Sequence, residues 1–465
     1  MSNFKNKIKN LFQNLKQVFL NFPLACFFAF FLTVMISYYI LEGTILEHEN
    51  LFYSTFIGCG IAILLAFSAD LFCHLRQLKL TQRIWCNVAV VLMTAICIGV
   101  IHANYDNMSS LYYILTLIFA ALLTLLVWPM LGKHNVEMTW NYHSHLLSAL
   151  AAACTMALII ILGIVAILAS IDFLFNVNIY DTLVIVITII CTFLFPCYIM
   201  ALMPINPEAY NKHLEYNDFM KVLVLYILLP LVCLEAIVLY IYAIKILLAW
   251  QLPKGGVAYL VFSYAIAASI VWYLLMPVFR SEQPSKLKFL DRGFFISLIP
   301  LLVLLFVGLF RRIHDYGFTT NRYIVLIIAC WFLIITIVMI FRKSRNVTPL
   351  LCSLVIISIL ALVGPWSMFS LPKSMQIKRF EKIANEYHLL ENGKIVPSAE
   401  PLSREQNITL SESLDIIMDS KEYRQDFAEH YFGFSPEKTD SLIDNYGYYD
   451  LKKQLMDQMN GKYIY

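Results

Sequence analysis

Long runs of hydrophobic residues, separated by short polar segments, make up most of the chain between Phe22 and Met368. Each of these eleven runs is long enough to cross a membrane as a helix, because a hydrocarbon core of roughly 30 Å requires about 20 apolar residues. In lipid every backbone polar group must find a partner within the protein, which favours helices. The pattern predicts an all-α fold, a polytopic transmembrane helix bundle. The predicted spans are 22–41, 51–73, 84–102, 111–131, 146–175, 181–203, 220–249, 256–279, 292–311, 323–341 and 348–368.

The amino-acid composition supports this class. Hydrophobic residues make up 60% of the chain and charged residues 14%, and the mean hydropathy is +0.71, whereas a soluble domain has about 25% charged residues. The runs at 146–175 and 220–249 are 30 residues long, so we expect these two helices to tilt, kink or project beyond the bilayer. Pro230 is the expected kink in the second of them.

Basic residues are concentrated in alternate connections between the predicted spans. Seventeen Lys and Arg residues fall on one side of the membrane and four on the other. Cytoplasmic loops carry the excess of positive charge in membrane proteins. We therefore predict a cytoplasmic N-terminus, and an odd number of spans then places the C-terminus outside the cytoplasm.

The chain is predicted to have three parts. Residues 1–21 have apolar positions at helical spacing among lysines and asparagines, which indicates an amphipathic helix on the cytoplasmic leaflet. Residues 22–371 form the transmembrane bundle, and residues 372–465 form a small, mostly helical C-terminal domain outside the cytoplasm.

Three local signals describe the C-terminal domain. Asn392-Gly393 between apolar pairs predicts a β-hairpin, and Ser435-Pro436 predicts the start of a helix. Thr409 and Glu412 resemble a capping box at another helix start. The polar section 397–408 is predicted to be a loop.

Signatures of catalysis are missing from the sequence. There is no Gly-rich phosphate loop, no His-Glu-x-x-His motif and no Gly-x-Ser-x-Gly motif. We expect His143 and His145 to belong to an interfacial belt of aromatic and histidine side chains rather than to a metal site. The sequence therefore predicts no metal, no cofactor and no nucleic-acid partner, and it assigns no catalytic residue.

Charged residues within the spans are costly unless they face protein or water. Asp70 and Asp172 lie near span ends and are expected to reach the membrane interface. Glu235 lies halfway along its span, so it either has a functional role or forms a structural hydrogen bond to a neighbouring helix.

Three polar segments, 250–256, 311–323 and 364–370, lie on the face predicted to be outside the cytoplasm, and the third leads to Gln376 and Arg379. The planar guanidinium of arginine suits phosphate and carboxylate groups. We therefore predict a site for an anion or lipid headgroup. Alternatively, these arginines pair with acidic residues of the C-terminal domain. The predicted ligand residues are Lys254, Arg311, Arg312, Tyr316, Thr319, Asn321, Arg322, Trp366 and Arg379.

The same segments carry a family resemblance. The motifs, in chain order, are Tyr240-x-Tyr242-Ala243-x-Lys245-Ile246-Leu247 followed by Trp250-x-Leu252-Pro253-Lys254-Gly255, then Tyr316-Gly317-x-Thr319-x-Asn321-Arg322-Tyr323, then Gly364-Pro365-Trp366-Ser367-x-Phe369-Ser370. Over residues 220–395 the chain resembles the bacterial multi-spanning family catalogued as domain of unknown function 4153. It departs from the family at Gly256, where an aromatic residue is common. The resemblance implies a bacterial inner-membrane protein and supplies neither a reaction nor a substrate.

Three classes of function remain open. The favoured one is an integral inner-membrane protein that binds an anionic ligand or lipid headgroup at its outer face. The alternative is an envelope sensor or assembly scaffold that acts through the exported C-terminal domain, and the third is a transporter or an enzyme of envelope lipids. The expected partners are the lipid bilayer, an anionic lipid or small anion, and an envelope protein that meets the C-terminal domain.

Overall fold

The computed structural model describes residues 16–42, 49–105, 110–132, 135–175, 179–211, 214, 216, 218–249, 257–281, 286–342, 345–418 and 421–464. Within these ranges nine helices are long and apolar enough to cross a membrane, and the apolar helices Ala258–Leu274 and Thr348–Leu360 are shorter. The strands in the same ranges form a single two-stranded hairpin. The prediction of an all-α polytopic bundle is therefore confirmed. Residues 1–15 of the predicted amphipathic helix lie outside the described residues.

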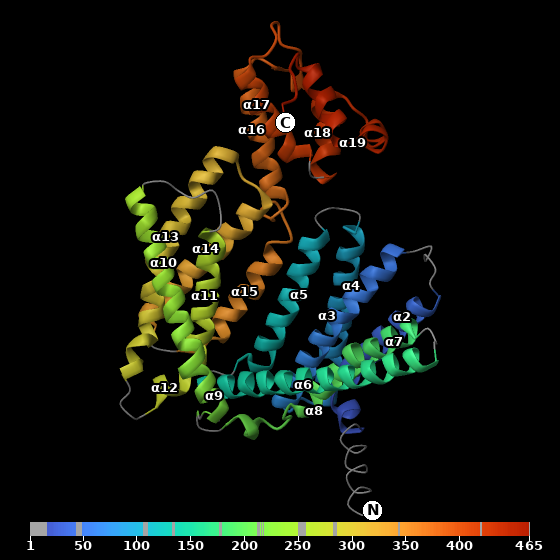
Figure 1. Ribbon diagram of the computed structural model, residues 1–465, viewed down its shortest axis with the longest axis vertical. Helices are drawn as coiled ribbons and strands as arrows, with labels where there is room; N and C mark the ends of the chain where they lie inside the picture. The colour runs from blue at the N-terminus through green and yellow to red at the C-terminus, as the bar shows by residue number, and fades with distance from the viewer. Residues whose placement is uncertain are drawn as a thin grey trace, which may run out of the picture.

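Four helices form the first part of the membrane bundle (Figure 1). The central one is α3, with 67% of its apolar stretch buried. Small residues allow this close packing, since a Cβ on Gly58 would lie 2.2 Å from Ile98 Cγ1 of the neighbouring helix. The helices are α2 (Pro23–Glu42), α3 (Glu49–Leu75), α4 (Leu80–Ala103) and α5 (Ser110–Val127), and the short turn η1 (Trp128–Met130) follows.

A long helical hairpin follows these four helices. Helix α6 (Val136–Phe175) has 40 residues, which corresponds to about 60 Å, or twice the thickness of a hydrocarbon core. It runs across the foot of α3 and α5 in Figure 1, so the prediction that this run cannot stand upright is confirmed. The returning arm packs on α2, where the hydroxyls of Thr33 and Thr192 lie 2.6 Å apart. This arm consists of α7 (Tyr180–Ile189), the π-helix η2 (Ile190–Leu194) and α8 (Phe195–Leu202), and the turn η3 (Pro207–Tyr210) follows.

The second part of the bundle has its own hydrophobic core, which includes the buried Tyr264 and Leu302. The distortion expected at Pro230 is present as a π-helix directly before it, because proline cannot donate a backbone hydrogen bond. Helix α15 (Thr348–Leu360) packs against α5 and so joins the two parts. The elements are α9 (Asp218–Val222), η4 (Leu223–Leu228), α10 (Leu229–Ala249), α11 (Val257–Leu274), α12 (Met276–Arg280), η5 (Lys286–Phe289), α13 (Leu290–Tyr316) and α14 (Thr320–Phe341).

The remaining elements form a compact unit at one end of the bundle (Figure 1). They are α16 (Ser370–Glu386), β1 (Leu390–Glu391), β2 (Lys394–Ile395), α17 (Arg404–Met418), α18 (Lys421–Phe432) and α19 (Pro436–Gln458). Their core contains the buried side chains of Phe380, Leu414 and Phe427. Tyr431 donates a hydrogen bond to Glu381 Oε1 at 2.6 Å, and burial, together with this bond, raises the pKa of the Tyr431 hydroxyl.

Two of the three local signals in this unit are confirmed. Leu390 pairs with Ile395 in an antiparallel hairpin, and the Ser435 side chain caps α19 by accepting from the backbone N–H of Lys438. The capping box at Thr409 is wrong, because α17 already begins at Arg404 and the Thr409 hydroxyl donates to the carbonyl of Glu405 inside the helix. Residues 404–408, predicted as loop, therefore belong to α17.

The two ends of the described chain lie at opposite ends of the long axis of the molecule. Residues 16–22 lie at the lower end in Figure 1, and the unit formed by α16–α19 lies at the upper end. Helix α13 runs from the lower to the upper end of the membrane bundle, and its 27 residues extend about 40 Å. The two ends of α13 each carry a cluster of polar contacts.

Candidate functional site

The upper end of α13 is joined to α14 by a turn of three residues, 317–319. Gly317 ends the helix with φ +77°, a left-handed conformation that favours glycine, and its N–H donates to the carbonyl of Ile313. Thr319 then has the extended backbone typical of the residue before a helix, and α14 begins at Thr320. This turn corresponds to the second of the three family motifs.

Helix α16 packs directly against this turn through two polar side chains. Gln376 is 1% exposed, and its Nε2 donates to the carbonyl of Phe318 at 2.8 Å. A Cβ added to Gly317 would lie 2.7 Å from both Gln376 Nε2 and Arg379 Nη1, so any other residue would displace these side chains as well as adopt a strained φ. From α14, Arg322 Nη1 donates to the carbonyl of Gly317 at 2.5 Å. We call Gly317, Phe318, Arg322, Gln376 and Arg379 the domain junction.

The third motif meets the second beside the domain junction. The Tyr323 hydroxyl donates to the carbonyl of Trp366 at 2.6 Å. Phe369 stacks on Tyr113 with ring centroids 4.4 Å apart, and Phe318, Tyr323 and Phe369 belong to one small buried cluster. The second and third motifs, which are separate in sequence, are therefore in contact.

The predicted ligand residues differ in where the structure places them. Arg322 and Arg379 lie together at Gly317. Asn321 is exposed and accepts a hydrogen bond from Tyr112 at 2.7 Å, while Trp366 joins the cluster through its backbone and its side chain is 53% exposed. Arg311 and Arg312 lie in the last turns of α13, and Thr319 lies in the turn. Lys254 and the side chain of Tyr316 lie outside the described residues.

Glu235 forms the structural contact that was one of its two predicted roles. Ser263 of α11 donates to Glu235 Oε1 of α10 at 2.8 Å. The Glu235 carboxylate therefore has a hydrogen-bond partner on a neighbouring helix, which lowers the cost of a charged group within a membrane span.

The expectation that Asp70 reaches the membrane interface is wrong. Asp70 is 6% exposed, because α2, α4 and α5 surround α3, and its Oδ2 has no hydrogen-bond partner among the described residues. Asp172, near the end of α6, is exposed, and its place at the membrane interface stays a prediction. The two ring nitrogens of His143 form hydrogen bonds with the Tyr273 hydroxyl and with the carbonyl of Leu126, and the interfacial belt expected for His143 and His145 stays a prediction.

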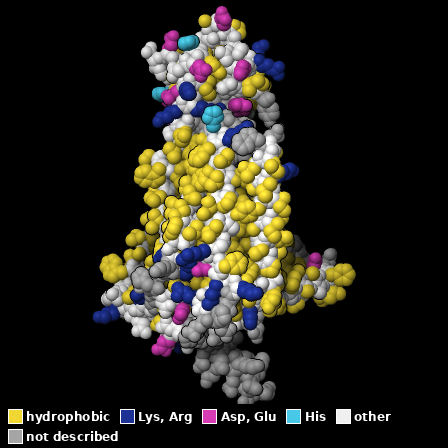
Figure 2. All heavy atoms as spheres, turned by 90° about the vertical axis from the view of Figure 1, so that its left-hand side faces the viewer, with side chains coloured by type: hydrophobic (Ala, Val, Ile, Leu, Met, Phe, Trp, Pro, Cys, Tyr) yellow, Lys and Arg dark blue, Asp and Glu magenta, His cyan; other side chains and the backbone are white. Residues whose placement is uncertain are grey.

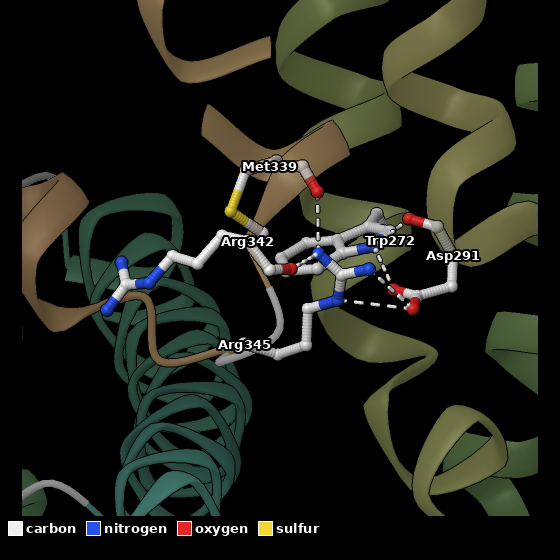
Figure 3. A network of polar contacts seen from close by, with 5 residues as sticks. All are labelled: Trp272, Asp291, Met339, Arg342 and Arg345. Carbon is white, nitrogen blue, oxygen red and sulfur yellow. Dashed lines mark hydrogen bonds and ion pairs between the residues drawn. The ribbon is translucent and has the colours of Figure 1, made fainter. Parts of the chain in front are cut away.

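A second polar cluster, which the sequence did not single out, lies at the lower end of α13 (Figure 3). Arg345 is 6% exposed and donates from Nε and Nη2 to Asp291 Oδ2 at 3.1 and 2.8 Å. Its Nη1 donates to the carbonyls of Met339 and Arg342 at 2.6 and 2.8 Å, so Arg345 caps the end of α14. Trp272 Nε1 donates to Asp291 Oδ1 at 3.1 Å.

The Asp291–Arg345 pair forms one wall of a cavity of about 470 Å³. We call this cavity the basic pocket, because four of its lining side chains are cationic and one is acidic. Figure 2 shows Lys and Arg side chains gathered below the hydrophobic band, at the end away from α16–α19. The positive-inside rule accounts for each of these basic residues separately. The pairing of the buried Arg345 with Asp291, which lies in the wall of the pocket, is visible only in the structure. The lining residues are Phe279, Arg280, Lys288, Phe289, Asp291, Arg292 and Arg345.

The fold and the apolar helices define a multi-pass α-helical membrane protein. The chain belongs to the family described as domain of unknown function (DUF4153), whose model matches residues 59–373. The resemblance seen in the motifs is therefore confirmed. The family match also takes in most of α3 and all of α4 and α5 but not α2, and it ends at Lys373, before the core of the C-terminal unit.

The sequence of the chain is also similar to that of one other bacterial protein. An uncharacterized protein of Pasteurella multocida (strain Pm70) is 29% identical over 291 residues. The alignment covers 62% of this chain and 48% of that protein, so the chain spans about half the length of its relative. No solved structure matches the chain.

Proposed function

We propose that the protein is a membrane scaffold that holds its C-terminal domain, residues 372–465, at a fixed position over one membrane face for contact with an envelope partner. The observation that supports this proposal is the domain junction. The buried Gln376 of α16 donates a hydrogen bond to the carbonyl of Phe318, and Arg379 of the same helix lies beside Gly317, which fixes α16 to the turn between α13 and α14. Arg322 of α14 donates to the same turn.

The burial of Gln376 is the strongest single argument for a fixed position. A buried side-chain amide costs free energy unless it is hydrogen-bonded, and Gln376 has a partner for Nε2 but none for Oε1 among the described residues. A flexible tether could remain in water and avoid this cost. The family model ends at Lys373, three residues before Gln376, so the bundle side of the junction belongs to the shared family region and the core of the domain does not.

The anionic-ligand function predicted for the same face stays a prediction. Arg322 and Arg379 do lie together at Gly317, which favours it. However, the hydrogen bond from Arg322 to the carbonyl of Gly317 accounts for the position of that guanidinium without a ligand. We therefore place the scaffold function first and the binding of an anion at the domain junction second.

The scaffold function can be tested by photo-crosslinking in living cells. A photoreactive phenylalanine analogue at Tyr449, which is 53% exposed in α19, should give a discrete adduct of higher mass in the envelope fraction. Gln376→Leu leaves the carbonyl of Phe318 without its donor, which costs about 1–3 kcal/mol, and should weaken this adduct several-fold. The same analogue at Lys79, exposed at the opposite end, should give no such adduct.

Two results would contradict the scaffold function. The first is the absence of any adduct from Tyr449 and from other exposed positions on α17–α19. The second is an adduct that Gln376→Leu leaves unchanged, because contact with a partner would then not depend on the fixed position of the domain.

A further inference from the structure

Among the described residues that line the basic pocket, three cationic side chains are not neutralised by Asp291, the one acidic side chain of that set. Asp291 is already paired with Arg345, which uses Nε and Nη2 on Oδ2, while Trp272 donates to Oδ1. This pair is a neutral, fixed wall. The remaining cationic side chains of the lining are Arg280, Lys288 and Arg292.

None of these three cations forms an ion pair with a described acidic residue. Lys288 donates to the carbonyl of Ser281 at 2.5 Å, a contact that does not neutralise its charge. Arg280 and Arg292 line the pocket, and no hydrogen bond or ion pair joins their side chains to any part of the chain that the structure describes. Like charges around one cavity repel each other, and an anion between them would remove that repulsion.

The position of the pocket points to the boundary of the bilayer. Its lining comes from α12, η5, the start of α13 and Arg345, at the end of the bundle away from α16–α19 (Figure 1). At that end, Figure 2 shows Lys and Arg side chains below the hydrophobic band. Phe289, 71% exposed, and Phe279 also line it. A site lined by cations and by aromatic rings, one of them exposed, suits a molecule that carries a phosphate and an apolar chain.

The positive-inside rule accounts for basic residues on this side but not for their arrangement. That rule concerns the number of Lys and Arg residues near span ends. It does not require them to surround a hollow whose volume lies within the usual range of ligand sites, about 300–1,000 Å³. It also does not require a buried arginine, Arg345, to be paired with Asp291 in the wall of that hollow.

We propose that the basic pocket binds the phosphate group of an anionic phospholipid through Arg280, Lys288 and Arg292. The chemistry recognised is a phosphate monoanion or dianion, and a soluble phosphate compound is the other possible source of that group. The pocket lies at the opposite end of α13 from the domain junction, so this proposal does not depend on the scaffold function.

The test uses the full-length protein in nanodiscs of phosphatidylcholine that contain a small fraction of phosphatidylglycerol. Native mass spectrometry after release from the disc counts the phosphatidylglycerol molecules that each protein retains. The variant Arg280→Gln/Arg292→Gln should lower that retention by about tenfold, since each basic side chain near a membrane surface contributes to the affinity for anionic lipid. A charge-retaining variant, Arg280→Lys/Arg292→Lys, should keep most of it and shows whether loss of fold explains the result.

A matched control removes two positive charges at the same end but outside the pocket. Lys79 is exposed in the link between α3 and α4, and the side chain of Arg342 points away from the Asp291–Arg345 pair in Figure 3. The variant Lys79→Gln/Arg342→Gln should therefore retain phosphatidylglycerol as the parent protein does. Equal losses in the two double variants, or no loss in the pocket variant, would overturn the proposal.

Adding glycerol 1-phosphate before release distinguishes the two sources of phosphate. If it leaves the retained lipid unchanged at millimolar concentration, the site selects the lipid. If it displaces the lipid from the parent protein, the pocket recognises the phosphate group itself, and a soluble phosphate compound becomes the ligand of choice.

Discussion

Gly317 is the residue at which one added atom should have the largest effect on the domain junction. Its φ of +77° is unfavourable for any other residue, and a Cβ would lie 2.7 Å from nitrogen atoms of Gln376 and Arg379. We expect Gly317→Ala to reduce the stability of the folded protein by about 1–3 kcal/mol. The midpoint of thermal unfolding, followed by tryptophan fluorescence of the purified protein, should fall accordingly.

A second glycine provides the control for this substitution. Gly163 lies inside α6, where an added Cβ meets no atom within 4 Å. Because alanine favours helix more than glycine does, Gly163→Ala should leave the midpoint unchanged or raise it slightly. If Gly317→Ala and Gly163→Ala behave alike, the close contact between α16 and the turn does not contribute to stability.

Among the single helices, α17 starts at a capping pair that was not predicted from the sequence. Ser403 and Gln406 form a reciprocal pair: the Gln406 side chain accepts from the N–H of Ser403 at 2.8 Å, and the Ser403 hydroxyl accepts from the N–H of Gln406 at 3.3 Å. We expect Ser403→Ala to speed hydrogen exchange in the first turn of α17 about fivefold, corresponding to about 1 kcal/mol. Thr409→Ala should have little effect, and a larger effect from Thr409 would contradict the observed helix start.

The elements that lipid dictates could be predicted from the sequence, and the contacts between elements could not. The apolar runs predicted the helices, because backbone groups without hydrogen-bond partners are not tolerated in a membrane. Asn392-Gly393 predicted the hairpin, because a two-residue hairpin turn favours these residues. The course of α6 was not predictable, since hydropathy indicates length but no angle. The first motif begins in α10, where Tyr240 and Lys245 lie. Its second half, within residues 250–256, lies outside the described residues.

In the candidate sites, too, the contacts between particular residues could be predicted only in part. The sequence placed Arg322 and Arg379 on one face, and the structure brings them together at Gly317. It did not assign a role to Gln376, because a glutamine in a polar segment gives no sign of burial. Arg345 and Asp291 are 54 residues apart, and only the packing of α13 against α14 makes them partners.

For the whole molecule, the arrangement of the helices bears on the direction of insertion. Residues 16–22 and the C-terminal domain lie at opposite ends of the long axis. The hairpin α6–α8 leaves and returns at the same end (Figure 1). Whether this hairpin crosses the membrane twice or lies along it, the opposite placement of the two described ends therefore does not change.

This arrangement, combined with the 17-to-4 distribution of basic residues, predicts the topology. A reporter enzyme that is active only outside the cytoplasm should be active when fused after Tyr465 and silent when fused after Arg83, which lies in the first turn of α4 at the end opposite to the C-terminal domain. A reporter active only in the cytoplasm should give the reverse result at both positions. The opposite outcome would place the basic pocket outside the cytoplasm and the C-terminal domain inside, and an envelope partner for that domain would then be excluded.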